Sequence, residues 1–151
     1  MHTVDAIRIG APLERVVAVA SAVERWPEFL AHYRRVEFLE RHDGGGLVVM
    51  SAWRWFGPLG WPTWWVSEMT VDAEPPCIRY RHVRGVTAGM DVQWRFDPTA
   101  AGVAVEIVHE WSGPRWPVIG RLAADRVIGP VFIHHIASRT LAGVKRRAES
   151  A

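Results

Sequence analysis

The C-terminal part of the chain, residues 116–149, carries the pattern that most constrains the fold. Its apolar residues recur mostly every three, four or five positions, which places most of them on one broad face of a helix. A helix over residues 130–149 alone would be about 30 Å long. It cannot bury that face against itself, so the preceding chain must cover it. The apolar positions are Leu122, Val127, Ile128, Val131, Phe132, Ile136, Leu141 and Val144.

The chain before this helix predicts strands joined by short turns. Helical spacing over residues 13–23 and a proline-initiated turn over residues 27–30 predict two short helices between the first two strands. Consecutive strands with short turns pair antiparallel. We therefore predict an α+β fold in which a curved seven-stranded antiparallel sheet wraps the C-terminal helix, with a functional gap between them. Alternation and Gly/Pro breaks place the strands at residues 3–10, 33–42, 47–56, 63–72, 77–84, 90–96 and 103–111.

Length and charge restrict the partners. The 151 residues fit one domain spanning residues 1–151. A net charge of +2 does not favour nucleic acid as a partner. No run of about 20 apolar residues predicts stable membrane insertion, and the single cysteine, Cys77, allows no disulfide within the chain. We expect a cytoplasmic protein. Its 9 tryptophans predict a large core, an aromatic-lined pocket or exposed aromatic anchors.

Several segments, in the same order along the chain, resemble one protein family. They are residues 23–30 (VERWPEFL), Tyr33, residues 36–41 (VEFLER), 65–70 (WVSEMT), 92–96 (VQWRF) and 108–111 (VHEW). The chain resembles the polyketide cyclase/dehydrase and aromatase branch of the START-related (SRPBCC) superfamily over nearly its whole length. This resemblance implies a helix-grip fold, with a cavity between the sheet and the C-terminal helix for a mostly apolar ligand.

The resemblance also implies a chemistry. In the cyclases of this family a tethered poly-β-ketone folds in the cavity, and polar groups direct an aldol closure and loss of water. Tyr33 matches a functional tyrosine of the family, whereas Met69 occupies the position of an inward arginine. A guanidinium can stabilise an enolate or alkoxide and a thioether cannot. Met69 therefore argues against the usual mechanism but not against the cavity.

Two histidines are candidates for acid–base chemistry together with Tyr33. Strand alternation places His109 on the inward face with Ile107 and Trp111. A neutral histidine in an apolar pocket can act as a general base; alternatively, it is a core residue that only hydrogen-bonds a neighbour. On the long helix, His135 is expected to face inward, opposite His109 across the cavity.

The remaining inward positions predict a ligand-binding lining. Tyr80 and His82 share one face of their strand, and a run of aromatic residues from Trp53 to Trp65 predicts either a pocket wall and rim or core residues with some exposed anchors. The histidine spacing gives no helical i, i+4 pair, so we predict neither a metal nor another cofactor. The expected ligand-binding residues are Trp65, Ser67, Met69, Tyr80, His82, Trp94, Trp111 and Phe132.

Three functional hypotheses stay open on the sequence. The first is a polyketide cyclase, aromatase or dehydratase that uses His109 and Tyr33, with an acyl carrier protein as a candidate partner. The second is a carrier or sensor that binds a lipid, quinone or other hydrophobic small molecule without chemistry. The third is a module that forms a homodimer through its tryptophans and has a filled cavity.

Overall fold

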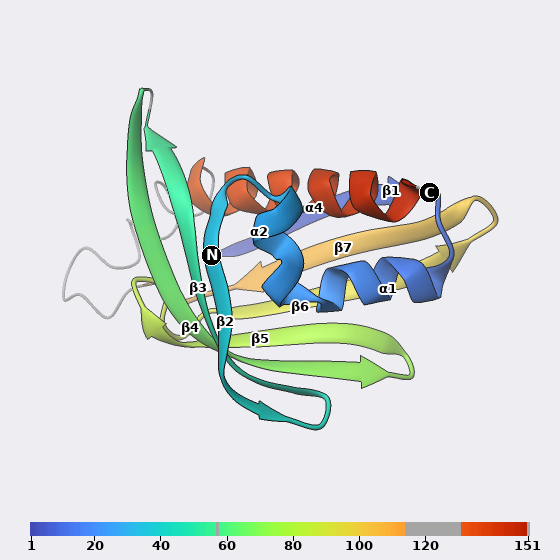
Figure 1. Ribbon diagram of the computed structural model, residues 1–151, viewed down its shortest axis with the longest axis horizontal. Coiled ribbons are helices and arrows are strands. Elements are labelled where there is room, and N and C mark those ends of the chain that lie inside the picture. The colour runs from blue at the N-terminus through green and yellow to red at the C-terminus, as the bar shows by residue number, and fades with distance from the viewer. Residues whose placement is uncertain (57, 114–130, 151) are drawn as a thin grey trace.

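The protein is built on one curved antiparallel sheet. The computed structural model describes residues 1–56, 58–113 and 131–150. The sheet has seven strands in the order β1-β7-β6-β5-β4-β3-β2, so that all neighbours except β1 and β7 are consecutive in sequence (Figure 1). This confirms the predicted architecture. The strands are β1 (His2–Ile9), β2 (Tyr33–His42), β3 (Gly45–Phe56), β4 (Leu59–Ala73), β5 (Pro76–Gly85), β6 (Asp91–Thr99) and β7 (Gly102–Glu110).

The short helices connect the two edges of the sheet. β1 and β2 are the edge strands, and α1 (Leu13–Ser21), the 3-10 turn η1 (Val23–Arg25) and α2 (Trp26–Phe29) lie between them in sequence. Pro12 precedes the first turn of α1, where a missing N–H costs no helical hydrogen bond. The prediction placed the second helix at residue 27, one position late, and did not include η1.

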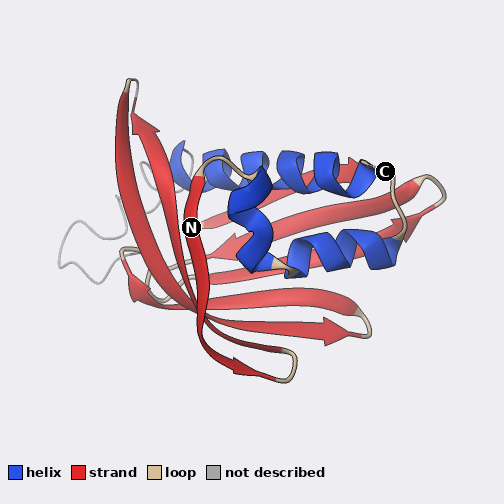
Figure 2. Cartoon of the chain, in the orientation of Figure 1, coloured by secondary structure: helices blue, strands red, loops and turns tan. Residues whose placement is uncertain are grey.

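Helix α4 (His134–Glu149) lies within the curve of the sheet, and Figure 2 shows α1 and α2 alongside it. Its buried face includes Ala137, Leu141 and Val144, spaced four and three residues apart as an amphipathic helix requires. Gly143 permits close packing, because a Cβ there would lie 2.0 Å from Cδ2 of Leu30. The helix thus contacts both the sheet and the segment after α2.

The start of the long helix differs from the prediction. The predicted segment over residues 130–149 contains one π-helical turn over residues 131–133 before α4 begins. Val131, the first residue of this turn, is 61% exposed and therefore does not lie on the buried face. The predicted helical positions 116–130, including the expected kink at Gly129 and Pro130, lie outside the described residues.

The strands facing α4 alternate as predicted. In β6, Val92, Trp94 and Phe96 are buried, whereas Asp91 and Arg95 are exposed. The same alternation buries His109 in β7, in register with Val92 of β6. A sheet with one buried face produces this two-residue period, and it fixes which side chains meet the helix.

The β3–β4 hairpin is longer than predicted. β4 begins at Leu59, which pairs with Phe56, and not at residue 63. The hairpin extends beyond the rest of the sheet (Figure 1). Three of its tryptophans are exposed, with exposed fractions of 50% for Trp55, 66% for Trp61 and 55% for Trp64. Of the aromatic run, Trp65 lines the cavity between sheet and helix, whereas Trp61 and Trp64 line a separate surface hollow.

Candidate functional site

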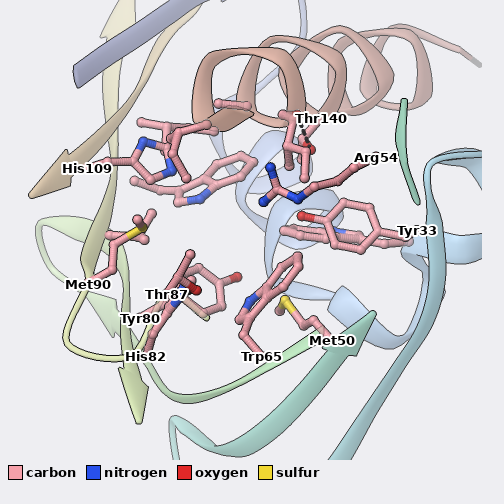
Figure 3. Close-up of a pocket in the computed structure, with 17 residues that line it drawn as sticks. Tyr33, Met50, Arg54, Trp65, Tyr80, His82, Thr87, Met90, His109 and Thr140 are labelled. Carbon is pink, nitrogen blue, oxygen red and sulfur yellow. Dashed lines mark hydrogen bonds between the residues drawn. The ribbon is translucent and has the colours of Figure 1, made fainter. Parts of the chain in front are cut away.

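A cavity lies between α4 and the concave face of the sheet (Figure 3). It leaves about 70 Å³ for the centres of water-sized molecules, which is room for several waters but less than most pockets for drug-sized ligands provide. The lining comes from α2, α4, strands β2 to β7 and the loop after β5. Its residues are Trp26, Tyr33, Met50, Arg54, Trp65, Tyr80, His82, Thr87, Met90, Val92, Trp94, Ile107, His109, Ile133, Ile136, Ala137 and Thr140.

One end of the cavity, here called the histidine end, consists of His82, Thr87 and His109. His82 Nδ1 and Thr87 Oγ1 are hydrogen-bonded at 2.7 Å, and the His82 ring stacks on Trp65 with ring centroids 5.8 Å apart. Gly85, with φ +99°, allows the chain to turn so that Thr87 reaches back to His82. His82 is therefore held in one orientation by a polar partner and an aromatic face.

The histidine end is uncharged at neutral pH. Burial lowers the pKa of His109 to about 4, and burial together with nearby His109 lowers the pKa of His82 to about 3. Removing an imidazolium from water without a carboxylate partner disfavours its charged form. Both rings can therefore accept a proton at pH 7, although the low pKa makes each a weaker base than an exposed histidine.

The opposite end, here called the arginine end, consists of Tyr33, Arg54 and Thr140 (Figure 3). Arg54 is only 5% exposed, and its Nε donates to Thr63 Oγ1 at 3.1 Å. The Thr63 hydroxyl in turn donates to the Ala52 carbonyl oxygen at 3.2 Å. Burial lowers the pKa of Arg54 to about 8, with Tyr33 opposing the shift. Arg54 is thus a fixed cation at neutral pH.

Tyr33 and Thr140 complete the arginine end. Burial raises the pKa of Tyr33 to about 12, opposed by its hydrogen bond to Thr140 and by the charge of Arg54. Thr140 Oγ1 also lies 3.0 Å from Nε2 of His32 and donates to the Ile136 carbonyl at 2.8 Å. The phenol of Tyr33 therefore stays protonated at neutral pH and is hydrogen-bonded to Thr140.

The middle of the cavity is apolar and aromatic. Trp26 packs against Tyr33 and Trp94, with ring centroids 5.1 Å and 5.8 Å apart. Met50 and Met90 lie on opposite sides of the space (Figure 3). Methionine side chains have several rotatable bonds and adapt to irregular volumes. The lining between the two ends can therefore change shape around a flat apolar ligand.

Four lining side chains have a buried polar atom without a hydrogen-bond partner in the described part of the chain. Buried polar groups in folded proteins are nearly always paired with protein or water. The Tyr80 hydroxyl points into the centre of the cavity (Figure 3). These groups give the apolar cavity a capacity to bind oxygen atoms of a ligand. The four atoms are Trp26 Nε1, Arg54 Nη1, Tyr80 Oη and His109 Nδ1.

Six of the residues predicted for the site line the cavity, and five do not. Those that line it are Tyr33, Trp65, Tyr80, His82, Trp94 and His109. Strand alternation was sufficient to identify them, because each lies on the buried face of its strand. Those that do not line it are Ser67, Met69, Trp111, Phe132 and His135.

The five residues outside the lining make other contacts in the structure. Met69 and Ser67 are buried in β4 on the same face as Trp65. The Trp111 indole donates to the Ala88 carbonyl at 3.1 Å and so anchors the loop that carries Thr87. The Phe132 ring lies against the Arg54 guanidinium. These residues pack around the cavity lining and do not form it.

His135 does not face His109 across the cavity. Burial lowers the pKa of His135, and the charges of Arg139, Arg54 and His134 lower it further. One of these cations, Arg54, belongs to the arginine end. Its Nε2 is buried without a hydrogen-bond partner among the described residues. The preceding His134 is bonded to Asp5. The residue that the helical phase predicted to point inward is therefore not part of the cavity lining, whereas His109 is.

Arg54, Thr87, Trp26 and Thr140 are the polar and aromatic lining residues that the sequence analysis missed. Arg54 had a readable signal, since Val48, Met50, Ala52 and Arg54 alternate along β3 and all four are buried. Trp53 and Trp55, on either side of Arg54, made the opposite face of β3 look like the apolar one. Thr87 lies in a loop whose path no periodicity predicts.

Two general properties of the described residues bear on the class of protein. Nowhere in residues 1–56, 58–113 and 131–150 do three or more His, Cys, Asp or Glu side chains gather in a way that could hold a metal ion. None of the helices in these ranges is long and apolar enough to span a membrane.

Comparison with known proteins identifies related sequences and folds. The family model for polyketide cyclase / dehydrase and lipid transport matches residues 9–127. A protein of Streptomyces halstedii named "Putative polyketide cyclase" is 34% identical over 103 residues, covering 68% of this chain and 93% of that protein. One of the same name from Streptomyces cyaneus is 30% identical over 112 residues, covering 74% and 72%. The crystal structure of the Zhui aromatase/cyclase from Streptomyces sp. R1128 shares the fold, with a TM-score of 0.84 and 20% identity over 99% of this chain and 93% of that one.

Proposed function

Since the chain belongs to the polyketide cyclase/dehydrase and lipid transport family, we propose that its cavity binds a mostly apolar, polyketide-like molecule and promotes its aldol cyclisation with loss of water. The observation that supports this most directly is the set of unpartnered polar atoms in an otherwise apolar cavity. A hydrocarbon would leave those atoms unpaired, which costs free energy, whereas a molecule with several carbonyl oxygens would pair them. The proposed ligand is therefore apolar in its body and oxygenated at intervals.

His109 is the proposed proton acceptor. Its imidazole is neutral at pH 7, because burial lowers its pKa to about 4. In an aldol step it would take a proton from the carbon between two carbonyl groups, and the resulting enolate carbon would attack a third carbonyl carbon. The alkoxide formed would recover the proton from the imidazolium. His109 would then take a second proton from the carbon next to a carbonyl, and the hydroxyl would leave as water by accepting that proton from the imidazolium as the C=C bond forms.

The two tyrosines are proposed to orient the carbonyl groups. Burial keeps the phenols of Tyr33 and Tyr80 protonated, since it raises the pKa of both. A protonated phenol donates a hydrogen bond to a carbonyl oxygen and strengthens that bond as negative charge develops. Met69 is not part of this arrangement, because its side chain lies outside the cavity lining.

The small volume of the cavity adds a requirement. A space of about 70 Å³ cannot hold a polyketide-sized molecule, so binding must be accompanied by side-chain movement. Met50 and Met90 are the flexible lining residues best suited to it. Ligand binding should therefore change the environment of both methionine methyl groups.

The test of the proposed function compares His109→Gln with the unmodified protein. A linear poly-β-ketone carried as a small thioester serves as substrate, and mass spectrometry follows the loss of water. We expect the variant to lose turnover by about 100-fold or more, the usual range for a general base, with thioester binding retained. His42→Gln at the exposed end of β2 is the matched control and should keep full activity. Equal turnover in both variants would exclude His109 as the base.

A carrier without chemistry is the second candidate, and the low pKa of His109 favours it, since a weak base is a poor catalyst near pH 7. In that case the wild-type protein would bind the thioester without converting it, and His109→Gln would change affinity alone. Delivery by an acyl carrier protein and dimerisation through the exposed tryptophans stay predictions. Native mass spectrometry of the protein as purified tests both the bound molecule and the dimer.

A further inference from the structure

Arg54 differs from every other polar group in the cavity because it carries a charge. At 5% exposure it is the most deeply placed guanidinium among the described arginines. None of the ion pairs among the described residues includes it, although most other ion pairs here use an arginine at the surface. Burying a charge without a counter-ion destabilises a folded protein, and Arg54 nevertheless lies at the cavity wall.

The contacts of Arg54 leave one side of the guanidinium available. Nε donates to Thr63 Oγ1, and Cζ lies over the Phe132 ring. Nη1 has no hydrogen-bond partner among the described residues. An arginine whose stem is fixed by a hydrogen bond and whose face is packed on an aromatic ring is already oriented, so binding an anion would cost it little additional conformational entropy.

The groups around Arg54 are neutral or cationic. Tyr33 is protonated, and His135, close enough for the charge of Arg54 to lower its pKa, has a buried Nε2 that also lacks a partner. Arg139 acts on the same histidine. Within the cavity lining, the unpartnered Nη1 of Arg54 is therefore a cationic donor with no carboxylate among the lining residues, and such a group favours a ligand with negative charge.

We infer that the arginine end binds the carboxylate of a mostly apolar organic acid, with its apolar body directed toward Trp65, Trp94 and the histidine end. Two oxygens sharing one negative charge match the planar donors of a guanidinium. This inference rests on the proposed function, because it requires that the cavity be the binding site, and it adds that the bound molecule carries a free carboxylate in addition to any thioester. The lowered pKa of Arg54 agrees with a cation that lacks its counter-ion in the free protein.

Benzoate and benzamide form a matched pair of probes for this inference. They have nearly the same shape, and only benzoate carries a charge. Methionine methyl groups labelled with ¹³C report where each probe binds, since Met50 and Met90 line the cavity and Met69 does not. We expect both probes to shift Met50 and Met90, and benzoate to bind at least tenfold more tightly than benzamide.

Variants of Arg54 then identify the group responsible. In Arg54→Met the preference for benzoate should disappear, and in Arg54→Lys it should be reduced but present, because lysine keeps the charge without the planar donors. Arg84→Met, which removes an exposed cation from β5, is the control for net charge and should keep the full preference. Resolved methyl signals show that each variant is folded.

The outcomes separate the inference from the proposed function. If both probes shift Met50 and Met90 with equal affinity, or if Arg54→Met keeps the preference, the carboxylate site is wrong and the binding cavity stands. If neither probe shifts these methyl groups at millimolar concentration, both the carboxylate site and the binding cavity are contradicted.

Discussion

The two ends of the cavity differ in the charge and the hydrogen-bond pairing of their buried polar groups. At the histidine end, the polar groups are neutral, and His82 is paired with Thr87 at 2.7 Å. At the arginine end, the guanidinium of Arg54 keeps a charge, and within the described part of the chain its hydrogen bond is made through Nε while Nη1 is unpaired. A neutral paired group costs little free energy to bury, whereas an unpaired charge costs several kcal/mol. The histidine end therefore leaves only a neutral atom, His109 Nδ1, without a partner among the described residues, whereas the unpaired charge at the arginine end is explained better by a ligand than by stability.

The same difference determines how a ligand would be oriented in the cavity. A molecule with one acidic and one apolar end would place its negative charge at Arg54 and bring its body toward His109. The histidine would then meet the ligand away from the charged group, where proton removal from carbon takes place in the proposed reaction. Binding and chemistry are thus assigned to different ends, and changes at each end should have separable effects.

The largest expected effect concerns acid stability and the histidine end. The pKa of His109 is lowered from 6.5 to about 4 in the folded protein, so between these values the unfolded chain binds more protons than the folded one. Stability is therefore unaffected by this group above pH 6.5 and falls as the pH drops from 6.5 toward 4, by about 1.4 kcal/mol per pH unit. Over two pH units His109 should contribute about 3 kcal/mol of this loss.

Urea unfolding of the wild type and His109→Gln at pH values of about 7 and about 4.5 measures this contribution. The free energy of unfolding should fall less steeply with acid in the variant, because glutamine does not titrate. Arg54 does not contribute, since it is protonated in both states over this range. Parallel pH dependence in the two proteins would mean that His109 is hydrated and titrates normally.

The second prediction concerns the arginine end. Replacing Arg54 by methionine removes an unpaired buried charge and keeps a long side chain in the same space, so the free energy of unfolding should rise by about 1–2 kcal/mol. A melting temperature higher by a few degrees is the measurement. Arg84→Met should change stability by less than about 0.5 kcal/mol. A destabilised Arg54→Met protein would instead assign Arg54 a structural role.

The fold could be predicted almost completely from the sequence. Two-residue alternation in β5, β6 and β7 places Tyr80, Trp94 and His109 on the concave face, because a sheet with one covered face has no other consistent register. The two short helices were predicted between β1 and β2, which are the edge strands of the sheet. The exceptions were at element ends, where the π turn before α4 and the early start of β4 at Leu59 depend on tertiary packing.

The site was only partly predictable, for physical reasons that differ between residues. In β3 the hydrophobicity is inverted, since Trp55 is exposed and Arg54 is buried, and a search for apolar lining therefore selects the wrong face. Met69 is buried on the predicted face but lies outside the cavity lining. Two-residue alternation predicts which face of the sheet a side chain is on, but it does not predict where along the strand the cavity lies. Thr87 reaches the cavity through a loop bond to His82, which no sequence period encodes.

The smallest expected effect tests whether the histidine end is satisfied by this loop bond. Thr87→Val keeps the shape of the side chain but leaves His82 Nδ1 without its partner, so stability at pH 7 should fall by about 1 kcal/mol. Thr87→Ser keeps the hydroxyl and should lose less than half as much. If valine is tolerated as well as serine, then water replaces Thr87 and the histidine end is as unsatisfied as the arginine end. The contrast between the two ends would then rest on the charge of Arg54 alone.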